Sequence, residues 1–321
     1  MKKFKKIIRA VLVLAVLAGL IYLIPKVITV VRLKRAADSY VAASSVSTFK
    51  DSKTTIIYDT NDQELCTMKN TKDMYYVSYQ EIPVTLVNSF VVMEDRQFYK
   101  HSGYDIKAIL RAIVINQKSN DIAQGASTIT QQLARNIFLS QEVTWQRKVE
   151  EIFIAVGLEK KYSKNQILEF YLNNIYFGNG YYGVEAAARG YFDKSVSELT
   201  LAEQAFIAAI PNNPTRYNPL TNYDNTVQRK NLILQQLYEA DDIGSLDRYM
   251  AETEEVVLNP HQTEEINNSV VTYARHCATE SLMSVSGFTF RYNFSSEDDY
   301  NAYEATYDTF YNLCQQKLLS G

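Results

Sequence analysis

The chain has 321 residues, of which 46% are hydrophobic and 21% charged, a composition typical of folded rather than disordered proteins. Its formal net charge of −3 excludes a nucleic-acid binder that relies on bulk positive charge. Six prolines and 11 glycines are few for this length, which favours long helices over a many-stranded barrel.

The first 35 residues differ from the rest of the chain. MKKFKKIIRA carries five basic residues, and the apolar stretch from Ala10 to Val31 that follows has Lys26 as its only charge. About 20 apolar residues in a helix match the hydrocarbon core of a bilayer, and the basic flank predicts a cytoplasmic N-terminus. A cleaved signal peptide is the alternative, but the apolar run is long for one. We therefore expect residues 1–35 to form a basic tail and an uncleaved transmembrane anchor.

Acidic residues gather at the other end of the chain. Residues 239–308 hold 15 Asp and Glu against three Arg, so the stretch 36–238 is close to neutral. An anionic ligand bound in that stretch must be held by individually placed residues. The cysteines Cys66, Cys277 and Cys314 are widely spaced, and only His276 adjoins one of them. Unpaired buried thiols are therefore favoured over a zinc site.

Beyond the anchor, the periodicity changes from strand to helix. Residues 48–83 alternate apolar and polar side chains around an Asn-Asp turn at 61–62, which predicts a short strand pair. Helical spacing then predicts helices over 84–95 and 105–118, the second capped by Asp105.

Further helices are expected over 128–139, 146–162, 163–177 and 198–210, with Ser163 and Ser197 as N-caps of two of them. The predicted domains are a basic tail and anchor at 1–35, a strand and linker region at 36–80, a helical domain at 81–258, and an acidic, Tyr-rich, linker-like segment at 259–321.

The segment MEDRQFYKHSGYD, residues 93–105, places two acids where an apolar helix ends. Glu94 and Asp95 close the helix, and His101 and Gly103 follow in the turn. A carboxylate at the edge of apolar surface is suited to act as a general base. The alternative is a solvated helix end whose acids pair with nearby cations, and from this segment alone that alternative is favoured.

The segment GASTITQQLARN, residues 125–136, is too polar for a core and lacks the Lys and Glu of an ordinary surface. Its Gly and Ala would permit close backbone approach and leave N–H groups at a helix start free for a phosphate or sugar oxygen. Ser127, Gln131 and Gln132 can hydrogen-bond hydroxyl groups, and Arg135 can bind a phosphate through two N–H groups. A well-capped helix with a polar face is the alternative, but adjacent glutamines followed by Arg-Asn exceed what a cap requires.

In RKVEE, residues 147–151, Arg147 and Glu151 are four residues apart and share a helix face. A routine ion pair explains this spacing as well as a charged group beside an anionic ligand does. Taken alone, the ion pair is favoured.

Side by side, these three segments and a fourth resemble the ordered motifs of one family. The peptidoglycan glycosyltransferases (family-51 glycosyltransferases), the polymerase module of bifunctional penicillin-binding proteins, carry ED..F..H.G, G.STITQQL.KN, RK..E and K..ILE.YLN..YFG. This chain has EDRQFYKHSG, GASTITQQLARN, RKVEE and KNQILEFYLNNIYFG in the same order. The resemblance covers roughly residues 50–240, and motifs this long exclude chance.

The resemblance implies a mainly α, lysozyme-like glycosyltransferase domain with an N-terminal transmembrane helix and a short β element. Its substrates would be lipid II, a disaccharide joined through pyrophosphate to a polyprenyl tail, and the growing glycan strand. Glu94 matches the catalytic base, and Glu151 matches the family's second glutamate. The residues expected to bind substrate are Asp95, Phe98, His101, Gly103, Arg111, Gly125, Ser127, Thr128, Gln131, Gln132, Arg135, Asn136, Arg147 and Lys148.

The implied reaction is attack by the 4-hydroxyl of lipid II on the anomeric carbon of the growing chain, with inversion to a β-1,4 link. Cationic side chains would assist departure of polyprenyl pyrophosphate. The resemblance also implies a single-pass protein of the bacterial cell membrane with its catalytic domain on the outer face. Cell-wall synthesis or division proteins are open as partners, and nucleic acid is not expected.

Some positions depart from the family pattern. The family usually has Lys where Arg135 stands, and often a basic residue near Val143 and another near Glu150. The lost positive charge leaves a divalent ion at the pyrophosphate site as an open alternative, although no ligand cluster requires a metal. A lone Ser-x-x-Lys, STFK at 47–50, has no Lys-Thr-Gly after it, so acyl transfer is not expected. A lysozyme-like glycan hydrolase and a catalytically weakened scaffold that binds lipid II stay open as alternative functions.

Overall fold

The structure is a computed structural model that describes residues 2–50, 55–58, 64–68, 73–111, 127–140, 142 and 144–260. Contacts divide the chain into two units, one made of residues 1–55 and 69–264 and the other of residues 56–68 and 265–321. The cysteines at 277 and 314, and nearly all of the acidic, Tyr-rich segment predicted at 259–321, lie outside the described residues.

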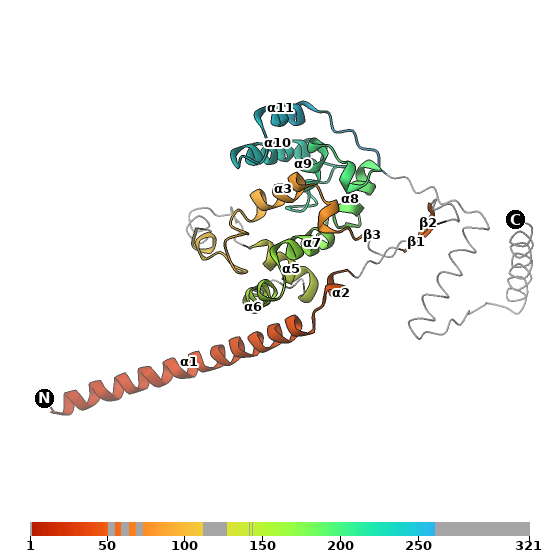
Figure 1. Cartoon of the computed structure of the whole chain (residues 1–321). Helices are drawn as coiled ribbons and strands as arrows, with labels where there is room; N and C mark the ends of the chain where they lie inside the picture. Colours follow the sequence, from red (N-terminus) through yellow and green to blue (C-terminus); the bar gives the residue numbers. More distant parts are fainter. Residues whose placement is uncertain are drawn as a thin grey trace, which may run out of the picture. The chain divides into compact units, whose positions relative to one another are not determined.

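The larger unit is mainly helical, as predicted (Figure 1). Its helices in chain order are α1 (Lys2–Ala43), α2 (Val46–Phe49), η1 (Tyr79–Glu81), α3 (Val84–Glu94), α5 (Ile129–Phe138), α6 (Trp145–Lys161), α7 (Lys164–Asn174), α8 (Val184–Phe192), η2 (Val196–Glu198), α9 (Leu201–Ala209), α10 (Tyr223–Glu239) and α11 (Ser245–Thr253). Residues 106–111 are also helical. The helices predicted over 84–95, 128–139, 146–162, 163–177 and 198–210 correspond to α3, α5, α6, α7 and α9.

The strands are short. β1 (Thr55–Tyr58) and β2 (Glu64–Met68) form a two-stranded sheet, which confirms the predicted strand pair. A second pair, β3 (Asp73–Met74) with β4 (Tyr181–Tyr182), is parallel and joins segments far apart in the sequence. Alternation within one segment cannot predict that second pair.

Helix α1 continues unbroken through Pro25 for 42 residues. Its C-terminal part packs against α6, where the Lys161 ammonium donates to the carbonyl oxygens of Val41 at 2.7 Å and Ala42 at 3.2 Å. These are carbonyls that a helix end leaves unpaired, so Lys161 caps α1. Within the part of the chain that the structure describes, no helix combines the length and the apolar character needed to cross a bilayer. The anchor therefore stays a prediction.

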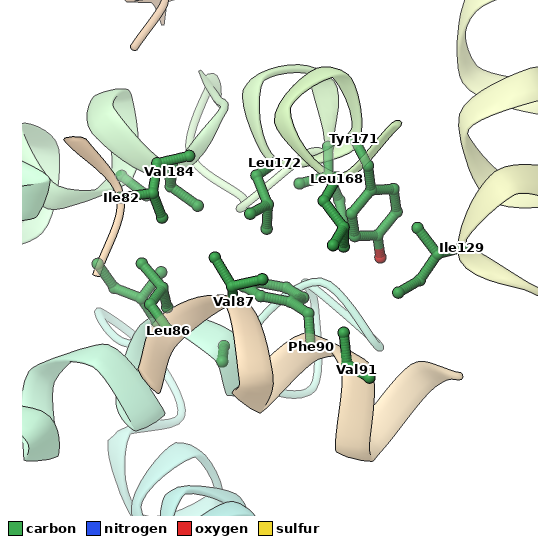
Figure 2. Close-up of a cluster of buried hydrophobic side chains, with 14 of the residues drawn as sticks. Ile82, Leu86, Val87, Phe90, Val91, Ile129, Leu168, Tyr171, Leu172 and Val184 are labelled. Carbon is green, nitrogen blue, oxygen red and sulfur yellow. The ribbon is translucent and has the colours of Figure 1, made fainter. Parts of the chain in front are cut away.

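The core of the larger unit surrounds α3. Figure 2 shows Leu86, Val87 and Phe90 of α3 facing Leu168 and Leu172 of α7, and all five side chains are buried. Helices α9 and α10 also pack against α3. Apolar residues on more than one side of α3 fix its position, and with it the position of the acidic C-terminal end that carries Glu94.

The helix caps match the sequence prediction at one serine and not at the other. Ser163 caps α7 through a reciprocal pair of hydrogen bonds with Gln166. Ser197 lies inside η2, and the cap of α9 is Thr200, whose hydroxyl accepts from the backbone N–H of Glu203 while the Glu203 carboxylate accepts from the backbone N–H of Thr200. The prediction of Ser197 was wrong because this residue belongs to a short 3-10 turn, and the helix begins only after that turn, at Thr200.

Candidate active site

Glu94 is the last residue of α3 and is only partly withdrawn from solvent. Its side chain is 18% exposed, and Oε2 accepts a hydrogen bond of 3.0 Å from Nε2 of Gln132. This bond joins the first sequence motif to the second across 38 residues of chain. The other carboxylate oxygen, Oε1, lies 3.9 Å from Nη2 of Arg229, which is beyond hydrogen-bond distance. One oxygen is thus held, while the other accepts no hydrogen bond from another described residue.

The orientation of Gln132 is fixed by a buried tyrosine on α7. The hydroxyl of Tyr171 donates to Oε1 of Gln132 at 3.2 Å, so the amide nitrogen of Gln132 faces Glu94. Burial first, and the nearby Glu94 carboxylate second, raise the pKa of Tyr171 well above its usual value. Tyr171 therefore remains a neutral donor. Gln132, expected to bind substrate, contacts the predicted base itself.

Asp95, the neighbour of Glu94, points into a different environment. Its side chain is 4% exposed, and its two carboxylate oxygens lie 3.0 and 2.8 Å from Nε2 of His101. Oδ2 also accepts the backbone N–H of Ile129 at 3.1 Å. A carboxylate at the first turn of α5 is favoured by the partial positive charge of the helix N-terminus. Asp95 therefore anchors α5 to the end of α3, and we expect its role to be structural.

His101 and Gly103 complete this anchor. Nδ1 of His101 accepts the backbone N–H of Gly103 at 3.1 Å, which leaves the Nε2 proton for Asp95. Gly103 has a φ of +102°, and a Cβ there would lie 2.8 Å from the backbone of Ala155 and Val156 on α6. Its carbonyl accepts from the hydroxyl of Thr128 at 2.8 Å. The glycine of this motif thus lets the turn lie directly on α6.

The start of α5 is occupied by internal hydrogen bonds. Thr128 is its N-cap, with the backbone N–H of Gln131 donating to the Thr128 hydroxyl and the backbone N–H of Thr128 donating to the Gln131 side chain. Ile129 also donates its backbone N–H to Asp95. The sequence had suggested that these N–H groups are free to bind a phosphate, but they are occupied by hydrogen bonds within the protein. Gln131 is fully buried, and its amide nitrogen has no partner among the described residues. Gly125 lies outside the described residues.

Glu151 holds a pair of cations on α6. Its side chain is completely buried; Nζ of Lys148 donates to Oε2 at 2.6 Å, and Nε of Arg147 lies 3.2 Å from Oε1. Lys148 also donates to the hydroxyl of Ser127 at 2.7 Å. A buried carboxylate between two cations fixes their positions and is costly to leave unpaired. Glu151 therefore places Lys148 beside the second motif.

The other predicted cations are less constrained. The guanidinium of Arg135 makes no ion pair with another described residue, although it lies close enough to influence Tyr171 electrostatically. Arg111 ends the described helical stretch 106–111, and both it and Asn136 are exposed. Phe98 is fully buried, with the Lys164 ammonium 4.2 Å from its ring centroid, so its role is in packing.

The fourth motif, which forms α7, makes hydrogen bonds to the chain segments on either side of α3. Lys164 donates to the carbonyl of His101 at 2.9 Å. Asn173 is buried and exchanges hydrogen bonds of 2.9 Å with both the N–H and the carbonyl of Val77, while Glu169 accepts from the hydroxyl of Tyr76 at 2.6 Å. These polar residues of α7 hold the turn after α3 and the segment before it.

Arg229 on α10 was not expected from the sequence. Besides its approach to Glu94, its guanidinium lies 5.0 Å from the ring centroid of Tyr217. No helix was predicted over residues 223–239, so the sequence offered no face on which to place this arginine. The only signal was a basic dipeptide, Arg229-Lys230, in an otherwise apolar and amide-rich stretch.

Comparison with known proteins decides the family. The profile of one family, described as transglycosylase, matches residues 61–238. The chain belongs to the transglycosylase family. Penicillin-binding protein 4 of Bacillus subtilis is 43% identical over 66% of this chain and 34% of its own. Penicillin-binding protein 1A of Aquifex aeolicus is 44% identical over 62% of this chain and 25% of its own.

Penicillin-binding protein 1A of Escherichia coli is 42% identical over 68% of this transglycosylase-family chain and 26% of its own. The chain thus spans about a quarter to a third of the length of these relatives. The crystal structure of penicillin-binding protein 1A from Haemophilus influenzae is similar over 72% of this chain and 24% of its own, at 22% identity. Its TM-score of 0.40 is too low to support a comparison of the sites.

Metal ligands do not gather in the described part of this transglycosylase. No group of three or more His, Cys, Asp or Glu side chains is placed there to hold an ion. The carboxylates of the motifs are instead committed to Gln132, His101, Lys148 and Arg147. The described residues therefore form no preassembled site for a divalent ion, and a divalent ion at the pyrophosphate site stays an untested alternative.

Proposed function

We propose that the chain is a membrane-anchored peptidoglycan glycosyltransferase that polymerises lipid II into β-1,4 glycan strands. The observation that carries the proposal is the carboxylate of Glu94, which is held through Oε2 by Gln132 on a side chain that is 18% exposed. The long match to the transglycosylase family supports the reaction class. The chain's polar and cationic groups suit a ligand that combines sugar hydroxyls with pyrophosphate.

Glu94 serves as the general base. The 4-hydroxyl of lipid II passes its proton to a carboxylate oxygen of Glu94 as its own oxygen bonds to the anomeric carbon of the growing chain. The bond from that carbon to the pyrophosphate oxygen breaks on the opposite face, so the configuration inverts. A general base of this kind contributes roughly a hundredfold to ten-thousandfold to a rate.

Cationic side chains stabilise the pyrophosphate leaving group. Polyprenyl pyrophosphate departs as an anion, so fixed positive charge assists it more than a proton donor does. Suited to this task are Lys148 and Arg147, which the buried Glu151 holds, and Arg135, which makes no ion pair with another described residue. Glu151 acts through these cations and is therefore a positioning residue.

The N-terminal helix α1 would serve as the anchor. Its basic start and apolar sequence favour a single pass with a cytoplasmic N-terminus, and the contact of its C-terminal part with α6 would hold the site near the bilayer that retains the polyprenyl tails. Fractionation of cells that express the full chain tests this: extraction by carbonate or high salt, without detergent, would contradict an integral anchor.

The reaction is tested by incubating detergent-solubilised protein with labelled lipid II, with and without Glu94→Gln. Long glycan made only by the wild type is the expected result. Cleavage of finished glycan without synthesis would instead favour the lysozyme-like hydrolase, and binding of lipid II without product would favour the scaffold. Equal polymer from the variant would contradict the assignment of Glu94 as the base.

A further inference from the structure

A surface hollow of about 630 Å³ is lined by residues of α3, α9, α10 and α11, four helices that lie together in Figure 1. Thr85 of α3 lines the hollow, and Glu94 ends the same helix. A rise of about 1.5 Å per residue places these two residues roughly 14 Å apart along the helix axis. The hollow is therefore distinct from the candidate active site, and the proposed reaction does not use it.

The lining of the hollow combines apolar and acidic side chains. Leu201, Ile243 and Met250 supply apolar surface. The acidic residues that line the hollow are Asp241, Asp242, Asp247 and Glu254. Among the described residues, no Lys, Arg or His lines the hollow, and none of the four acids forms an ion pair. The hollow thus offers apolar surface together with negative charge that the described residues do not neutralise.

Hydrogen bonds hold these carboxylates in place without neutralising them. Asp242 accepts from the side chain of Asn88 on α3 at 2.7 Å. Glu254 accepts from the hydroxyl of Thr200 at 2.6 Å. Carboxylates held near one another repel, so a cation that enters the hollow gains favourable interactions with several of them at once.

The nearby cations are engaged in other contacts. Lys230 on α10 is buried, and its ammonium donates to the backbone carbonyls of Ala251 at 2.9 Å and Glu252 at 3.3 Å. Arg248 on α11 lies 3.5 Å from the carboxylate of Glu252, which does not line the hollow. The positive charge that complements the hollow must therefore come from another part of the chain or from another molecule.

The exposed face of α11 extends the apolar surface of the hollow. Leu246, Tyr249 and Met250 are 70%, 61% and 61% exposed, and their spacing places them on one face of the helix. The one buried residue of α11 is Ala251. Single exposed apolar side chains are common, but a group of large ones on one helix face marks an interaction site.

We propose that the hollow and this face of α11 together form a docking surface for a separate protein, which binds through a segment that carries Lys or Arg among apolar side chains. The basic side chains would enter the hollow, and the apolar ones would cover Leu246, Tyr249 and Met250. Tyr and Met are residue types that protein interfaces favour. This inference goes beyond the proposed function and does not depend on it.

Charge argues against the other occupants of this surface. Residues 260–321 of the same chain carry eight Asp and Glu against three Lys and Arg, so their net charge has the same sign as the hollow. A second copy that docked through the same face would place the four carboxylates opposite their equivalents. A lipid surface attracts basic rather than acidic faces.

The first test is photo-crosslinking of the full chain in its native cells. A photo-reactive amino acid replaces Leu246, and the matched control places it at Leu232, which is 47% exposed on α10 and does not line the hollow. Mass spectrometry identifies the linked molecule. We expect position 246, and not position 232, to link to one other protein at a segment that contains basic and apolar residues.

A neutralised variant, Asp241→Asn with Asp247→Asn, tests whether the charge carries the contact. Asn tolerates the positive φ of Asp241, and an amide oxygen at position 247 can still accept the N–H of Gly244. The control variant, Asp38→Asn with Asp224→Asn, removes two exposed acids that do not line the hollow. The cross-link from position 246 should fall about tenfold in the neutralised variant and persist in the control.

A second measurement gives the affinity directly. The segment found by cross-linking is synthesised as a peptide and titrated against the detergent-solubilised full chain. The neutralised variant should raise Kd about tenfold, and the control variant should stay within about twofold of the wild type. Salt should weaken binding to the wild type more than binding to the neutralised variant.

Several outcomes would overturn the proposal. Links from position 246 to this chain itself would assign the surface to a second copy or to residues 260–321, and links to lipid would assign it to the membrane. An absence of links, or a Kd that the neutralised variant leaves unchanged, would refute the docking surface. Because neither measurement uses lipid II, a failure of the proposed function would leave these results unaffected.

Discussion

Glu94 and Asp95 are adjacent in the chain, yet their surroundings are opposite. Asp95 is nearly buried and accepts bonds from His101 and from the backbone of Ile129. Glu94 is more exposed and, among the described residues, accepts one side-chain hydrogen bond, from Gln132. A fully satisfied carboxylate stabilises a fold, whereas a carboxylate with an open oxygen can take part in chemistry. Under the proposed mechanism, the pair divides structure and reaction between two consecutive residues.

The largest effect we expect is on Glu94. Glu94→Gln should lower the rate of glycan synthesis by at least roughly a hundredfold, because an amide cannot accept the hydroxyl proton. The free energy of unfolding should change by no more than about 1 kcal/mol, since the amide oxygen can still accept from Gln132. Lipid II polymerisation and thermal unfolding of the same preparation measure both; a marked loss of stability would mean that Glu94 is structural like its neighbour.

The turn that completes the Asp95 anchor should be the next most sensitive. Gly103→Ala places a side chain at positive φ and against the backbone of α6, which should destabilise the protein by roughly 3 kcal/mol. Gly180→Ala is the matched control, because Gly180 also has positive φ but open space around it. Chemical denaturation of both variants should show a clearly smaller loss for Gly180→Ala; equal losses would mean that close packing on α6 is unimportant.

Asp95→Asn is the counterpart of Glu94→Gln. Removing the charge weakens the bonds to His101 and to Ile129, and we expect a loss of about 2 kcal/mol in the free energy of unfolding. Residual synthesis should survive at temperatures where the variant is folded, because the base is unchanged. Denaturant titration together with activity below the unfolding transition tests this. Full stability with abolished synthesis would reverse the division of roles between the two acids.

The smallest effect concerns a third acid that contacts α3. Asp242 accepts from the side chain of Asn88 at 2.7 Å, and burial raises the pKa of Asp242 above its usual value. A raised pKa in the folded state means that the stability contributed by this group is present at low pH and lost as pH rises through that pKa. Asp242→Asn should thus slightly raise the unfolding temperature at neutral pH and leave it unchanged in acid, measured by thermal scans at both. A lower unfolding temperature at neutral pH would contradict this.

The sequence alone was most informative about local structure. Alternation predicted the β1–β2 pair, and helical spacing predicted α3, α5, α6, α7 and α9. Both patterns could be read from the sequence because each depends on residues that are only a few positions apart in the chain. Ser163 was predicted as a cap for the same reason, and Asp105 accepts the backbone N–H groups of Lys107 and Ala108 as a cap should. The prediction of Ser197 as a cap was wrong because two other residues close to it in sequence are the caps: Ser195 caps η2 and Thr200 caps α9.

Side-chain types and spacing also determined which motifs carry the candidate chemistry, and the family match agrees with them. Only the tertiary structure decided how those residues divide their roles. In the folded chain, Asp95 is buried, whereas Glu94 is partly exposed. The N–H groups at the start of α5 form hydrogen bonds within the protein. Arg229, on a helix far away in the sequence, lies close to Glu94. The physical reason is that capping and periodicity act over about four residues, whereas the direction in which a carboxylate points depends on helices packed around it from elsewhere in the chain.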